Sequence, residues 1–232
     1  MKRLLILLGI ALFGAPYQVF AAIGCTLTNP AQDLKYLYPE MTTYKEDLYA
    51  FPQMKDGGEQ FRAFRERMAG ELDPIYENYE TAYTVYSIFK GPEKIGIVHG
   101  VNVPGQGGVI QVFLSMDPKT SEIRSFLFQR LESPAARQLR SKEFRVQFEG
   151  LTLGDFYKHD YYAAVDPRAK ADKVGAIKPP TLDASGRPDY EASLRGIRKN
   201  LILLDFFVYG RRFDPYFERA KQATEKAKSR KE

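Results

Sequence analysis

The sequence has few of the residues that build disulfide and metal sites. Cys25 is the only cysteine in 232 residues, so no internal disulfide can form. A thiolate metal site has no second cysteine to use. Only two histidines are present, His99 and His159, which excludes a histidine-rich metal site. The sequence therefore predicts no metal, and we expect His99 to be a hydrogen-bonded residue of a sheet.

Common nucleotide-binding and hydrolase motifs are absent as well. The chain contains no Walker A sequence and no Gly-x-Ser-x-Gly elbow. The glycine-rich run at 105–108 begins like a dinucleotide fingerprint, but Ile110 stands where the third glycine belongs. This run also joins two predicted antiparallel strands with no helix behind it, which excludes the Rossmann arrangement. A hydrolase lacks a recognisable nucleophile and base.

Positive charge is concentrated at the two ends of the chain. The formal net charge of +5 comes from 34 basic and 29 acidic residues. Residues 211–232 contribute +4, because eight Lys or Arg face four Asp or Glu, and Lys2 with Arg3 adds +2. The remaining body carries −1, so it is not a basic platform for nucleic acid. We expect 211–232 to be a basic helical tail that is either solvated or in contact with anionic lipid headgroups.

The N-terminus has the pattern of an export signal. Two basic residues precede the apolar run Leu4–Phe13, which is about ten residues long, whereas a membrane span needs roughly twenty. We predict a signal peptide over 1–21, with cleavage after Ala21. The alternatives are a lipoprotein signal to residue 24 with lipidation of Cys25, and an uncleaved anchor. Each of these makes the protein exported, either periplasmic or membrane-anchored.

Alternating residues and tight turns predict four consecutive antiparallel strands, which is typical of an α+β fold and not of a doubly wound sheet. The predicted strands are 81–89, 95–103, 109–116 and 122–131, with a further strand at 43–51. The predicted helices are 30–38, 59–68, 134–140, 143–148, 153–157 and 193–209, and residues 163–189 are expected to be loop. This pattern predicts an antiparallel β-sheet meander packed with helices. The domain would span 80–210, with an extension at 22–79 packing on it.

Several short segments, in their order along the chain, resemble the FMN-binding domain family. These are 96–101, 109–115, Glu132-Ser133-Pro134, Gln147-Phe148-Glu149-Gly150 and Ala192-Ser193. The family includes the flavin subunits of the Rnf and sodium-pumping NADH:quinone reductase complexes. The resemblance covers about residues 80–210. It implies an FMN-binding-domain-like fold, FMN as cofactor, and a membrane redox complex or a membrane surface as partner.

The resemblance also implies which residues would hold FMN. The family commonly joins the FMN phosphate to the threonine of a Ser-Gly-Ala-Thr motif at the start of a helix, where free N–H groups and the helix dipole favour an anion. Here the matching stretch would be 191–195, which assigns the phosphate to Ser193 and Arg195. The ring would lie against Glu132, Ser133 and Pro134. The chain departs from the family at Glu191 and at Ala135, where the family has glycine.

Three states of the cofactor remain open: covalent FMN, a flavin or other planar ligand held without a covalent bond, and no cofactor. Ser193 would in the last case be a plain helix N-cap. A register through Ser185-Gly186 is rejected, because it places Pro188, which has no hydroxyl, at the acceptor position.

The leading hypothesis is FMN-dependent electron transfer at or near the membrane. The alternative is a cofactor-free accessory or scaffold domain of the same fold that binds a partner protein or membrane component. Either role is favoured over that of a stand-alone catalyst.

Overall fold

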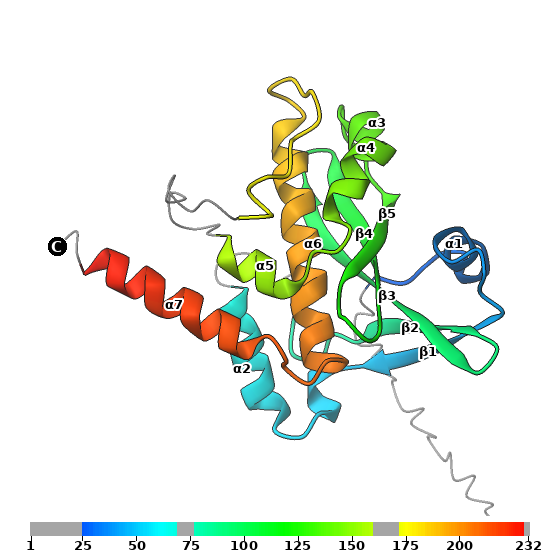
Figure 1. The fold of residues 1–232 in the computed structure, drawn as a ribbon, viewed down its shortest axis with the longest axis horizontal. Helices are drawn as coiled ribbons and strands as arrows, with labels where there is room; N and C mark the ends of the chain where they lie inside the picture. Colours follow the sequence, from blue (N-terminus) through cyan, green and yellow to red (C-terminus); the bar gives the residue numbers. More distant parts are fainter. Residues whose placement is uncertain (1–24, 69–76, 160–171, 230–232) are drawn as a thin grey trace, which may run out of the picture.

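A single five-stranded antiparallel sheet organises the protein (Figure 1). The computed structural model describes residues 25–68, 77–159 and 172–229. The strands lie in sequence order: β1 (Thr43–Tyr49), β2 (Tyr83–Lys90), β3 (Glu93–Gly105), β4 (Gly108–Met116) and β5 (Ile123–Arg130). The predicted α+β fold with an antiparallel meander is therefore confirmed. Among the described residues, no helix is both long enough and apolar enough to cross a membrane.

The first strand comes from the segment expected to pack on the domain. β1 pairs along its whole length with β2, from Thr43 opposite Phe89 to Tyr49 opposite Tyr83. Residues 43–49 are thus an edge strand of the same sheet. The β2–β3 connection is a two-residue turn in which Gly91 has a φ of +57°, a conformation that favours glycine.

One long helix covers one face of the sheet, and shorter helices surround it (Figure 1). α6 (Arg187–Phe207) packs on β3 and β4, while α1 (Pro30–Leu37) lies against the opposite face. α2 (Gly57–Arg67), α5 (Leu153–Lys158) and α7 (Asp214–Lys228) gather beside α6. The remaining short helices are η1 (Phe51–Gln53), α3 (Ala136–Leu139), α4 (Lys142–Arg145) and η2 (Val146–Phe148).

The two faces of the sheet have separate apolar cores. The larger core lies between the sheet and α6, where Gly196 lets the helix approach closely, since an added Cβ would come within 2.7 Å of Val112 Cγ1. The smaller core lies under α1 and contains Tyr38, Phe113 and Cys25. Burial of apolar area on both faces, at about 25 cal/mol per Å², is the main stabilising contribution.

The smaller core encloses Cys25, the residue considered for lipidation. Its side chain is only 3% exposed, and burial raises the pKa of its thiol to about 12. In the described fold the sulfur of Cys25 is therefore enclosed by the smaller core. The predicted signal peptide, residues 1–21, lies outside the described residues.

We expect Cys25 to react with a thiol reagent only when the protein unfolds. At neutral pH a thiol with so high a pKa is almost entirely protonated, and the reactive species is the thiolate. Reaction of the native protein with 5,5′-dithiobis(2-nitrobenzoate) should be slow and should accelerate strongly in urea. A mature protein without a titratable thiol even in urea would indicate that Cys25 is modified.

Candidate functional site

The helix expected to open at Ala192–Ser193 begins earlier. α6 starts at Arg187, so Ser193 lies six residues into the helix, about 9 Å along its axis. The Ser193 side chain is fully buried, and its Oγ donates a 2.7 Å hydrogen bond to the carbonyl of Asp189. The prediction that Ser193 opens the helix is therefore wrong, and so is its alternative role as N-cap. Arg195 is also inside the helix and partly exposed.

The helix begins at the Ser185-Gly186 stretch, which the sequence analysis rejected as the place of a phosphate acceptor. Gly186 is the N-cap and Pro188 is in the first turn, which places Ser185-Gly186-Arg187-Pro188 at the helix start. Proline suits this position because its fixed φ matches the helix and its missing N–H would be unbonded there anyway. It offers neither a hydroxyl for a phosphoester nor an N–H for a phosphate oxygen.

Two carboxyl groups of the chain itself occupy the start of α6. Asp183 Oδ1 accepts hydrogen bonds from the backbone N–H of Ser185 at 3.1 Å and of Gly186 at 3.0 Å. These bonds, together with the one from the Ser185 hydroxyl, hold the pKa of Asp183 below its usual value, the hydroxyl contributing most. Asp189 is fully buried, and its Oδ1 accepts a 2.7 Å bond from the N–H of Gln106.

The loop predicted to face a flavin ring does lie beside this helix start. A Cβ added to Gly186 would come within 2.7 Å of Ala135 Cβ, and one added to Gly107 would come within 2.0 Å of the Glu132 carbonyl oxygen. The structure therefore brings together the loop that follows β5, the β3–β4 turn and the start of α6. The three ring-side residues Glu132, Ser133 and Pro134 belong to this loop.

Within that loop the polar side chains bond to near neighbours. Glu132 forms an exposed ion pair with Arg130 at 2.8 Å, and Ser133 Oγ accepts a 3.1 Å bond from the N–H of Ala135. Arg187, the first cation of α6, pairs in turn with Glu191 at 3.2 Å.

The residues at the start of α6 do not fit the phosphate of FMN. A phosphate would need free N–H groups or an unpaired cation. The N–H groups of Ser185 and Gly186, just before the helix, already bind the Asp183 carboxylate, and the nearby cation Arg187 is paired with Glu191. The buried Asp189 carboxyl adds a second acceptor, and its Oδ2 has no hydrogen-bond partner among the described residues. A phosphate oxygen placed against these carboxylate oxygens would find no donor, which is unfavourable for binding an anionic ligand.

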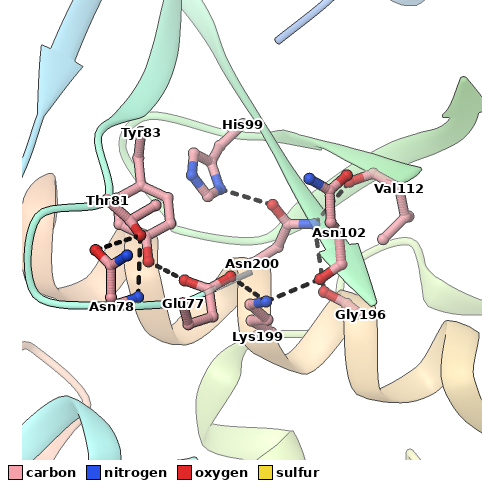
Figure 2. A network of polar contacts seen from close by, with 10 residues as sticks. All are labelled: Glu77, Asn78, Thr81, Tyr83, His99, Asn102, Val112, Gly196, Lys199 and Asn200. Atoms are coloured by element: carbon pink, nitrogen blue, oxygen red, sulfur yellow. Dashed lines mark hydrogen bonds and ion pairs between the residues drawn. The ribbon is translucent and has the colours of Figure 1, made fainter. Parts of the chain in front are cut away.

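A second polar cluster lies at the middle of α6, between the helix and the sheet (Figure 2). Lys199 forms an ion pair with Glu77 in which both side chains are 3% exposed, and its Nζ also donates a 2.8 Å bond to the carbonyl of Asn102. The hydroxyl of Tyr83 donates a hydrogen bond to the same glutamate. Desolvation and the neighbouring Glu77 carboxylate raise the pKa of Tyr83 well above its usual value.

The next residue of the helix continues this cluster. Asn200 Nδ2 donates to the carbonyls of Val112 at 3.0 Å and Gly196 at 3.3 Å, which leaves its Oδ1 to accept the 2.7 Å bond from His99 Nδ1. Burial lowers the pKa of His99 to about 4, so the imidazole is neutral at pH 7. His99 is thus a hydrogen-bonded sheet residue, as its position in a predicted strand indicated.

This buried cluster holds the fold together and has no access for a substrate. Its charged groups are enclosed and bind one another, so they attach α6 and the segment at 77–83 to the sheet. This cluster could not be predicted from the sequence, because Lys199 and Asn200 belong to no motif and are two of several polar residues in the helix. Among the described residues, no group of three or more His, Cys, Asp or Glu could hold a metal ion.

Similarity to known proteins is slight. No family model matches this chain, and no curated protein matches it. Five chains of solved structures match, among them the crystal structure of NqrC from Shewanella oneidensis. That match has 16% identity and a TM-score of 0.44, and it covers 85% of this chain and 90% of that one. Values at this level do not establish a common family or a shared function.

Proposed function

We propose that this protein is an exported accessory domain, without a phosphoester-linked flavin, that binds a partner protein or membrane component. One observation carries the proposal: Asp183, Pro188 and the buried Asp189 lie at the start of α6, so a phosphate there would meet carboxylate oxygens and a residue without an N–H. Asp183 Oδ1 already accepts from the N–H groups of Ser185 and Gly186, and Asp189 Oδ1 accepts from the N–H of Gln106. The partner implied by the resemblance is a membrane redox complex.

The test is the visible spectrum of the protein as isolated from the exported fraction of its own host. We expect a colourless protein, because carboxylate oxygens of Asp183 and Asp189 lie at the helix start and Arg187 is already paired with Glu191. Ser193→Ala should leave the spectrum unchanged and should alter the free energy of unfolding by less than about 1 kcal/mol, since it removes one hydrogen bond inside a helix. A yellow protein that loses its colour through this substitution would refute the proposal.

A second candidate function is FMN-dependent electron transfer, with the flavin held without a covalent bond. The observation that favours it is the meeting of the Glu132–Pro134 loop with the β3–β4 turn and the start of α6. A yellow protein whose colour is released on denaturation would favour this candidate. The loop Glu132–Pro134, and not Ser193, would then contact the flavin. The double substitution Glu132→Ala and Ser133→Ala should therefore weaken flavin binding.

A further inference from the structure

A cleft opens at the opposite end of α6 from the site described above. Its volume is about 570 Å³, within the range of about 300–1,000 Å³ that is usual for small-molecule sites. It lies between the C-terminal end of α6, the edge strand β1 and the start of α2 (Figure 1). The residues that matter for its chemistry are Leu48, Tyr49, Lys55, Phe206, Phe207 and Arg211.

One wall of the cleft is aromatic and firmly held. The rings of Tyr49 and Phe207 stack with centroids 5.5 Å apart and planes at 27°, and both residues remain partly exposed. Phe207 also packs on Tyr83 and Phe51 at 5.4 and 5.2 Å, so its position is fixed from behind. Such a wall suits a flat conjugated ring.

The other side of the cleft carries two cations. Lys55 is exposed and has no ion pair among the described residues, and it precedes α2, whose N-terminal end favours negative charge. Arg211 lies 5.3 Å from the centre of the Phe206 ring, with hydrogen bonds to Gln60 at 3.3 Å and Asp214 at 2.7 Å. The charge of Lys55 is therefore available to a ligand, while that of Arg211 is positioned by its neighbours.

The backbone that presents Arg211 is strained. Gly210 and Arg211 both have left-handed conformations, with φ of +62° and +60°, and the second costs a non-glycine residue of the order of 1 kcal/mol. The Arg211 N–H bonds the Asp205 carbonyl at 2.8 Å, which holds this conformation. The strained turn keeps the guanidinium at the cleft.

We propose that this cleft binds a small molecule with a flat conjugated ring system and one anionic substituent. The ring would lie on Tyr49 and Phe207, and the anion would face Lys55. The proposal goes beyond the accessory role and does not depend on it, because the cleft is at the far end of α6 from Asp183 and Asp189.

Two dyes with the same ring system and different charge test the proposal: 1-anilinonaphthalene-8-sulfonate and the neutral N-phenyl-1-naphthylamine. Each is titrated by fluorescence into the folded full-length protein. We expect one saturable site for the sulfonate, and Lys55→Glu should weaken its binding about tenfold, equal to about 1.4 kcal/mol. The affinity for the neutral dye should not change with this substitution.

Lys142→Glu is the matched control. Lys142 is exposed, lies at the start of α4 far from the cleft, and has no ion pair among the described residues. This variant should bind both dyes as the wild type does. Equal sulfonate affinity in Lys55→Glu and Lys142→Glu, or no saturable binding of the sulfonate to the wild type, would overturn the proposal. The latter result would point to a cleft that recognises a polypeptide.

Discussion

Replacing Lys199 with methionine should cost about 3–5 kcal/mol of unfolding free energy. The substitution keeps most of the apolar stem but leaves the Glu77 carboxylate buried without its counterion, beside the Tyr83 hydroxyl. It also removes the bond to the Asn102 carbonyl. Urea denaturation at pH 7 of wild type and variant gives the difference directly.

The control for this substitution is an ion pair on the surface. Lys221 pairs with Glu66 at 2.7 Å, with side chains 45% and 49% exposed, and Lys221→Met should cost less than about 1 kcal/mol. Glu77→Gln combined with Lys199→Met should recover part of the loss, because no charge is then left uncompensated. If Lys199→Met cost no more than Lys221→Met, the buried pair would contribute nothing to stability.

The second large effect is a loss of stability in mild acid that depends on His99. Burial lowers the pKa of His99 from its usual 6.5 to about 4. Between these values the unfolded chain takes up a proton that the folded protein excludes. Stability therefore falls as the pH drops from about 6.5 to about 4, by about 3 kcal/mol for this group. Denaturation curves at several pH values should show the decrease in the wild type.

His99→Asn isolates this contribution. Its amide can still donate to Asn200 Oδ1, while the proton-binding ring is gone. Asp205 acts in the opposite direction, because burial raises the pKa of its carboxyl to about 6 and so lowers stability as the pH rises from about 4 to 6. Both proteins contain Asp205, so their difference reports His99. Equal pH dependence of wild type and variant would contradict the neutral buried state.

The meander could be predicted from the sequence because its signals are local. The strands are rich in β-branched and aromatic residues, and each turn between β2 and β5 contains Gly, Pro or Asp, which favours pairing of neighbouring strands in order. The pairing of β1 with β2 has no such signal, since residues 50–82 separate the two strands. The same holds for the ion pair between Glu77 and Lys199, which depends on contacts across the whole domain.

The start of α6 was misplaced for a definable reason. Apolar spacing begins only at Leu194, because the first two turns of the helix carry Arg187, Asp189 and Glu191. One start signal is nevertheless present, because Pro188 lies in the first turn and directly follows Gly186 and Arg187. Weighting this signal above the apolar period would have assigned the correct register and left Ser193 inside the helix.

We propose that this chain carries no covalently bound flavin phosphate, because the carboxylates of Asp183 and Asp189 lie at the start of α6. The most direct test is the intact mass of the denatured protein purified from the exported fraction of its own host. We predict the mass of the polypeptide alone, beginning at the cleaved or uncleaved N-terminus. A mass increased by one FMN minus the water lost in phosphoester formation would contradict the account.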